Sequence, residues 1–123
     1  MTIASWMIDS GTPLDAVSKE DVIQHADCIR RGESLLLDTA DGATTADAVL
    51  DMFLGPLGET ISPYVLDSTP NILSMGRRVI DHGYTFAWPG WSLWPFYIHP
   101  TTRKSIHMLV EYYSPYLDDI WRD

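Results

Sequence analysis

The chain has 123 residues, of which 46% are apolar, and a formal net charge of -9. This length suits one domain with a modest core, and the apolar content argues against disorder throughout. The excess of acid repels phosphate backbones, so we expect no nucleic-acid binding by this domain. The sequence shows no apolar run of the ~18 residues that a membrane span needs and no signal-peptide pattern. Because Cys28 is the only cysteine, we expect a reducing, intracellular location, the cytoplasm.

Apolar runs divided by turn residues predict a mostly β domain with one or two short helices. The run at 4–8 predicts a buried strand that stops at the turn Asp9-Ser10-Gly11. Further strands are expected at 34–39, 46–54, 60–66, 71–75, 84–88, 96–99 and 105–113. We expect one helix from the N-cap Ser18 to about Cys28, a polar turn at 30–34, and a second helix at 77–82 that Gly83 caps.

The tripeptide Asp9-Ser10-Gly11 after an apolar strand is the strongest chemical signal in the sequence. A carboxylate on such a tight turn can face a partner carboxylate, because the glycine lets the backbone approach closely and the neighbouring hydroxyl can brace the loop. Taken alone, the tripeptide is more often an ordinary turn. A competing candidate is Asp38, which also follows an apolar run, in Leu-Leu-Leu-Asp-Thr-Ala.

Spacing favours Asp9 over Asp38. Gly76 directly precedes the helix expected at 77–82, which serves as a fixed point. Asp38 lies only 38 positions before Gly76, whereas Asp9 lies 67 positions before it. The shorter interval leaves little room for a loop, a hairpin and the strands that follow. A hairpin is expected there because the pair Asp41-Gly42 is typical of a hairpin tip.

The segment 60–78, Thr-Ile-Ser-Pro-Tyr-Val-Leu-Asp-Ser-Thr-Pro-Asn-Ile-Leu-Ser-Met-Gly-Arg-Arg, resembles the closing segment of retropepsins. In that family a strand leads to Thr-Pro and an apolar pair, and Gly-Arg then opens a short helix. The segment 79–86, Val-Ile-Asp-His-Gly-Tyr-Thr-Phe, continues the same order. The Leu-Ser-Met-Gly variant, and Thr-Ala-Asp-Gly at 39–42 where the family has its flap hairpin, look most like proteases of copia-type retrotransposons. The resemblance covers roughly residues 6–88.

This resemblance implies a retropepsin-like aspartic endopeptidase with a closed β barrel, the acid protease fold. It implies a catalytic turn formed by Asp9, Ser10 and Gly11. It also implies substrate-binding positions, in the loop after this turn and in a mobile flap, at Thr12, Asp15, Ala40, Asp41, Gly42 and Ala43. The sequence departs from the family where Thr12 replaces the usual Ala, where Asp15 lies two places later than the family's acid, and where only eight residues precede Asp9.

One chain supplies one catalytic aspartate, whereas the chemistry needs two. One carboxylate acts as base on water while the other, protonated, donates to the scissile carbonyl. Two close carboxylates cannot both ionise cheaply and therefore share one proton. A homodimer related by a two-fold axis would supply the pair. The expected function is cleavage of peptide bonds in a polyprotein by water activated between two Asp9 carboxylates, with no cofactor, metal or membrane partner.

The C-terminal part of the chain, 89–123, is expected to be an extension of the single domain 1–123 or its dimerisation segment. The aromatic cluster at 88–97 is either a binding or dimer surface or a loop folded back over a sheet. One of the arginines at 77 and 78 is expected to pair with a carboxylate such as Asp15, and Arg78 is expected to be exposed.

Two other functions stay open at this point. One is a catalytically silent retropepsin-like dimer that binds a peptide or protein in its cleft. The other is an unrelated small β barrel that binds peptides through its Trp and Tyr surface. The four histidines, His25, His82, His99 and His107, have no metal-ligand spacing with one another or with Cys28, so no metal site is expected.

Overall fold

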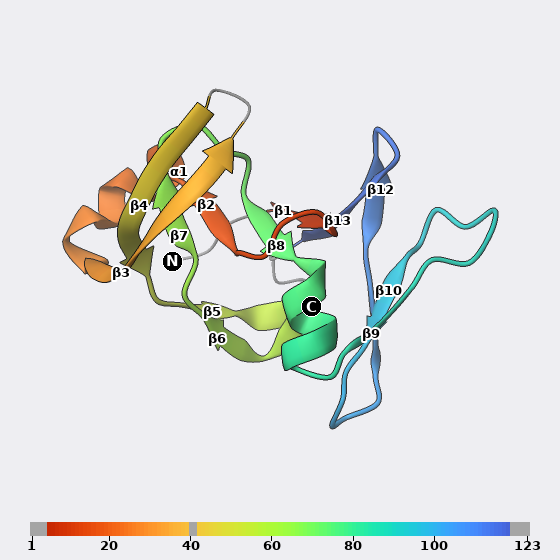
Figure 1. Cartoon of the computed structure of the whole chain (residues 1–123). Coiled ribbons are helices and arrows are strands. Elements are labelled where there is room, and N and C mark those ends of the chain that lie inside the picture. The colour runs from red at the N-terminus through yellow and green to blue at the C-terminus, as the bar shows by residue number, and fades with distance from the viewer. Residues whose placement is uncertain (1–4, 40–41, 119–123) are drawn as a thin grey trace.

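Short strands dominate the part of the chain that the computed structural model describes, residues 5–39 and 42–118, so the protein is mainly β (Figure 1). In chain order the strands are β1 (Ser5–Asp9), β2 (Ala16–Ser18), β3 (Ile29–Thr39), β4 (Gly42–Leu50), β5 (Met52–Leu54), β6 (Glu59–Ile61), β7 (Tyr64–Leu66), β8 (Ile72–Ser74), β9 (Thr85–Ala87), β10 (Phe96–Ile98), β11 (Ser105–His107), β12 (Leu109–Glu111) and β13 (Ser114–Asp118). They form an eight-stranded sheet in the order β12-β13-β1-β8-β2-β7-β4-β3, a three-stranded sheet β11-β10-β9 and the hairpin β5-β6.

Both predicted helices are present and short. The first is an α-helical turn, α1 (Lys19–Val22), that continues as a 3₁₀ helix, η1 (Ile23–Cys28). Ser18 precedes it with extended backbone, although its side chain makes no capping hydrogen bond. The second is a π-helical turn, η3 (Arg77–Asp81), and Gly83 follows with a φ of 78°. This left-handed conformation explains why glycine stands there. A third, 3₁₀ turn, η2 (Gly55–Leu57), joins β5 to β6.

Side chains from the whole length of the described chain share one hydrophobic core. In β1 the alternation expected of a strand places Trp6 and Ile8 inward, and both are buried. The C-terminal part of the chain adds Tyr97 of β10, Leu117 of β13, and Met108 between β11 and β12 to the same cluster. Residues between 89 and 118 therefore contribute to the core of the domain rather than forming a separate unit.

The differences from the predicted strands have local causes. The prediction of a polar turn at 30–34 is wrong, because this segment lies within β3. A bulge between Arg31 and Leu35 accommodates the change of register with β4. The strand expected at 60–66 is divided before Tyr64 by buried Pro63, which cannot donate to a strand ladder. The short strand β2 and the C-terminal strand β13 were not predicted.

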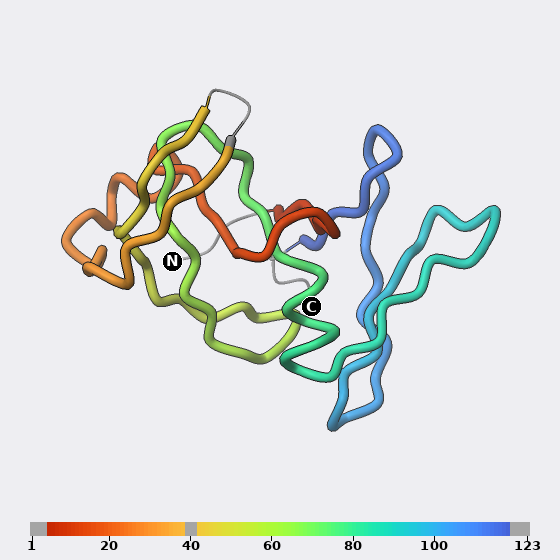
Figure 2. The backbone as a smooth tube through the Cα atoms, in the orientation of Figure 1, coloured from red at the N-terminus to blue at the C-terminus, as the bar shows by residue number. Residues whose placement is uncertain are grey.

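The large sheet has two open ends, β12 and β3, which lie at the extremes of its strand order. No pairing within residues 5–39 and 42–118 joins them, so the closed barrel implied by the resemblance is not found there. Figure 2 shows the β3–β4 hairpin on one side of the molecule and the loop between β9 and β10 projecting on the other. Within the described ranges, no helix is long and apolar enough to cross a membrane.

Candidate active site

Asp9 is the last residue of a central strand of the large sheet. The β1 strand lies between β13, with which it is antiparallel, and β8, with which it is parallel. The parallel register sets Ile8 opposite Leu73 and Asp9 opposite Ser74. Because Ile8 and Leu73 are buried, the sheet fixes the backbone immediately before Asp9. The Asp9 side chain itself is half-buried, and Ser10 and Gly11 are exposed.

The turn after β1 closes on the Asp9 carboxylate. The backbone N–H of Gly11 donates to Asp9 Oδ1 at 2.7 Å. A Cβ atom at position 11 would lie 3.2 Å from the same oxygen, which is tighter than ordinary van der Waals contact. Glycine therefore allows the backbone to approach the carboxylate, as the sequence predicted. The Asp9 carboxylate thus receives a donor from its own turn.

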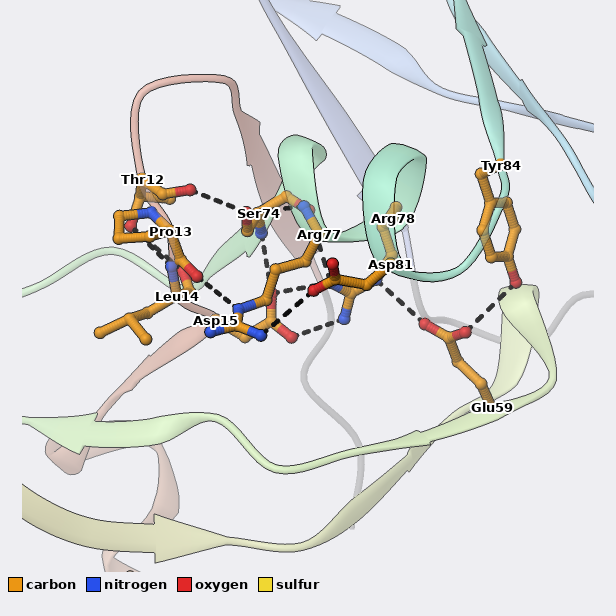
Figure 3. Close-up of polar contacts among 10 residues, drawn as sticks. All are labelled: Thr12, Pro13, Leu14, Asp15, Glu59, Ser74, Arg77, Arg78, Asp81 and Tyr84. Carbon is orange, nitrogen blue, oxygen red and sulfur yellow. Dashed lines mark hydrogen bonds and ion pairs between the residues drawn. The ribbon is translucent and has the colours of Figure 1, made fainter. Parts of the chain in front are cut away.

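Ser74 joins the loop 10–15 to the segment that leads into η3 (Figure 3). Its side chain is fully buried. Its hydroxyl donates to the carbonyl of Thr12 at 2.7 Å and accepts the backbone N–H of Arg77 at 3.2 Å. Its own backbone N–H donates to Asp15 Oδ1 at 2.8 Å. A second contact, from Arg77 Nε to the carbonyl of Pro13, closes the same loop.

An ion-pair network around buried Arg78 holds Asp15 at the end of this loop (Figure 3). Arg78 is 1% exposed, and its two terminal nitrogens donate to the two oxygens of Asp15 at 3.0 and 2.5 Å. Its Nε lies 3.0 Å from Glu59 Oε1, as an ion pair without the alignment of a hydrogen bond. The Tyr84 hydroxyl completes the network. It lies 3.2 Å from the carbonyl oxygen of Leu57 and 3.4 Å from Glu59 Oε2, and its single proton can be donated to either acceptor.

The network has a clear electrostatic order. Burial lowers the pKa of the Arg78 guanidinium, but the hydrogen bonds and charge of Asp15, with the charge of Glu59, outweigh it and leave this pKa above its ordinary value. Burial, then the nearby charge of Glu59, raises the pKa of Tyr84 to about 12. Arg78 therefore stays charged and Tyr84 neutral throughout the physiological pH range.

These contacts settle the arginine predictions. An arginine does pair with Asp15, as expected, but it is Arg78, whose predicted exposure is wrong. Both Asp15 oxygens bind groups of the same chain. The role of Asp15 in substrate binding stays a prediction, and such a role would be indirect, through the position of its loop. The adjacent Arg77 is the exposed one, and it pairs with Asp81 at 3.4 Å.

Two pockets flank the loop. One, of about 260 Å³, is lined by Leu14, Asp15, Thr60, Ile61, Ser62, Tyr64, Arg77, Arg78 and His82. The other, of about 250 Å³, is lined by Thr12, Pro13, Ser74, Gly76, Arg77, Ile80 and Asp81. Thr12 lines the second pocket, and its role in substrate binding stays a prediction. No group of three or more His, Cys, Asp or Glu side chains is placed to hold a metal ion in the described ranges.

The competing Asp38 lies in a different environment. It is an exposed residue of β3, opposite Ala43 of β4, within the predicted flap hairpin. Gly42 begins β4 with a φ of 108°, which favours glycine. The tip residues Ala40 and Asp41 lie outside the described residues. Asp38 therefore occupies a strand of the hairpin, whereas Asp9 ends an internal strand of the large sheet at a tight turn.

Sequence reasoning missed Ser74, Glu59 and Tyr84 as supports of the site. Ser74 carried a usable signal, because a serine three residues before Arg77 has the spacing of a hydroxyl that accepts an N–H at a helix start. Glu59 and Tyr84 meet Arg78 only through tertiary packing, so no local pattern marks them.

Comparisons with known proteins do not assign the chain to a family: no protein-family model matches the sequence, and no curated protein matches it significantly.

Proposed function

We propose that the chain is one subunit of a retropepsin-like aspartic endopeptidase of retroelement type, in which two copies each contribute Asp9. The observation that carries the proposal is the Asp9 turn. It ends β1 beside the parallel strand β8, closes on its own carboxylate, and is followed by a loop that Ser74 binds at the Thr12 carbonyl. A site that positions a proton-transfer group needs such support from neighbouring residues.

In this mechanism each Asp9 has one of two roles. One carboxylate removes a proton from a water molecule while the other, protonated, donates to the oxygen of the scissile carbonyl. The shared proton follows from the mutual repulsion of two close carboxylates. The β3–β4 hairpin would cover the bound peptide. It is linked to the loop 10–15 through the sheet, because β4 pairs with β7 and β7 pairs with β2.

The resemblance to copia-type proteases adds the substrate class, a polyprotein. The experiment is incubation of the unmodified protein with a peptide library between about pH 4 and 7, with and without a pepstatin-type inhibitor. Cleavage should be inhibitor-sensitive and strongest below neutral pH, where the shared proton is retained.

A matched pair of variants identifies the catalytic carboxylate. Asp9→Asn keeps the shape of the side chain but cannot accept the proton from water, so cleavage should fall by about 10²–10⁴-fold or more. Asp38→Asn makes the same chemical change on the flap hairpin and should retain activity. The opposite result would move the site to Asp38.

A catalytically silent dimer that binds peptides is the second candidate. It is favoured by the exposed side chains of Trp91 and Trp94, because aromatic residues are enriched in binding surfaces. Binding of library peptides without cleavage at any pH in this range would replace the endopeptidase with this binding function.

A further inference from the structure

The C-terminal segment 84–118, here called the aromatic segment, differs from the rest of the chain in composition. It contains 10 of the 14 aromatic residues, and its two acids are balanced by two basic residues. Residues 1–83 instead carry 13 acids against 5 basic residues. Two copies of such an acidic chain repel each other over most of their surfaces. The aromatic segment is the part where they can approach without this repulsion.

Within this segment, a strained turn exposes two tyrosines. Tyr112 and Tyr113 form the two-residue connection between β12 and β13, with φ values of 50° and 65°. Two-residue turns with positive φ at both positions strongly favour Asn-Gly, and bulky residues adopt them at a cost. Both side chains are 94% exposed, so contacts within the chain do not offset that cost. Strain of this kind often marks a functional surface.

The tyrosine turn lies at the catalytic end of the sheet. In the antiparallel pairing of β1 with β13, Ser5 is opposite Asp118 and Met7 is opposite Tyr116. Moving along β1 toward Asp9 therefore means moving back along β13 toward Ser114, the residue that follows the turn. The Asp9 turn and the tyrosine turn share one end of this ladder. A second copy bound there would approach the single catalytic aspartate of this chain.

The loop 88–95 presents a second aromatic surface in a fixed shape. Trp88 Nε1 donates to the carbonyl of Ser92 at 3.0 Å, and the Ser92 hydroxyl accepts the backbone N–H of Trp94 at 2.9 Å. The carbonyl of Pro95 accepts the N–H of buried Met108 at 2.8 Å, which fixes the loop beside the start of β12. Trp91 at its tip is fully exposed. A preorganised aromatic loop loses little conformational entropy on binding.

We infer that two copies of this chain associate through the aromatic segment, with the Tyr112–Tyr113 turn as the contact nearest the paired Asp9 residues and the Trp91 loop as a second contact. The partner is a second copy because the segment is uncharged on balance in an otherwise acidic chain, and because the candidate site is incomplete with one Asp9. The inference rests on the proposed function for that last reason. It adds which residues form the interface.

The test uses a variant that should improve the turn while removing the contact. The double variant Tyr112→Asn/Tyr113→Gly introduces the pair that this turn geometry prefers, so the monomer should fold with an unchanged or higher denaturation midpoint. Its dimer dissociation constant, measured by sedimentation equilibrium, should rise about tenfold or more. Trp91→Ser should also weaken the dimer. The control Phe53→Ser removes an aromatic side chain that is 60% exposed outside the segment and should leave the dissociation constant unchanged.

Each outcome decides between the inference and the proposed function. A dimer of unmodified protein that the turn variant and Trp91→Ser both leave equally tight overturns the inferred interface, and the endopeptidase proposal then rests on the peptide assay alone. Unmodified protein that stays monomeric to about 100 μM, far above the range of specific dimers, overturns both. If the turn variant fails to fold, Trp91→Ser with its Phe53→Ser control decides the question.

Discussion

The guanidinium of Arg78 binds both carboxylate oxygens of Asp15, joining the helical turn η3 to the loop after Asp9 across 63 positions of sequence. Both partners are buried or nearly so, with side chains 1% and 10% exposed. A buried ion pair contributes modestly in itself, but removing one partner leaves the other charge without compensation. The loop that carries the candidate site therefore depends on a buried arginine of η3, far from it in sequence.

Arg78→Met should lower the free energy of unfolding by about 3–5 kcal/mol, because Asp15 and Glu59 would stay buried without a cation. Arg77→Met is the matched control, since it makes the same change in net charge at the next position. Its ion pair with Asp81 and its hydrogen bond to the Pro13 carbonyl are both exposed to solvent, so the loss should stay within about 2 kcal/mol. Urea denaturation of the two variants measures the difference. Equal losses would contradict the assignment of Arg78 as the structural arginine.

Gly32 occupies a close approach at the base of the predicted flap hairpin. A Cβ atom there would lie 2.5 Å from Cγ2 of buried Val49, on the strand paired with β3. Gly32→Ala should therefore destabilise the protein by about 1–3 kcal/mol through overpacking. In the double variant Gly32→Ala/Val49→Ala the clash is removed, so the total loss should be smaller than the sum of the single losses. Additive losses in denaturation measurements would show that this contact does not limit position 32.

The pKa of Asp51 gives a prediction at acidic pH. Hydrogen bonds from Arg30 at 2.7 and 3.0 Å and from Ser62 at 2.6 Å lower the pKa of this carboxyl to about 2. Because the pKa is lowered in the folded state, the ionised carboxylate of Asp51 stabilises the fold fully above its ordinary pKa of about 3.9. This stabilisation is lost as the pH falls toward about 2. Arg30→Gln should move the pKa upward toward about 3.9, as followed by the carboxyl carbon signal of Asp51 in NMR titration. An unchanged titration would contradict the role of Arg30.

The mainly β fold and both short helices could be predicted because they depend on local patterns: apolar runs, Asp-Gly and Gly83. The neighbours of β1 could not. Nothing near Asp9 indicates that β13 would pair with β1, because that partner lies more than 100 positions away. The same limit applies to Arg78, whose sequence neighbours favoured exposure at a helix start, whereas Asp15 and Glu59 meet it only after folding. Predicting the Asp9–Gly11 turn succeeded because all its atoms are local.

Ser74 links this local turn to the rest of the fold and gives the last prediction. Its buried hydroxyl satisfies the carbonyl of Thr12 and the N–H of Arg77 at once. Ser74→Ala leaves both groups without that partner, so unfolding should become easier by about 1–3 kcal/mol. If the clamp positions the Asp9 turn, peptidase activity should fall under conditions where the variant is still fully folded. The control Ser68→Ala changes an exposed serine in the same approach to β8 and should alter neither stability nor activity. A Ser74→Ala protein that is less stable but cleaves peptides at the unmodified rate would limit Ser74 to a structural role. A misplaced turn must slow the proton transfers proposed for Asp9.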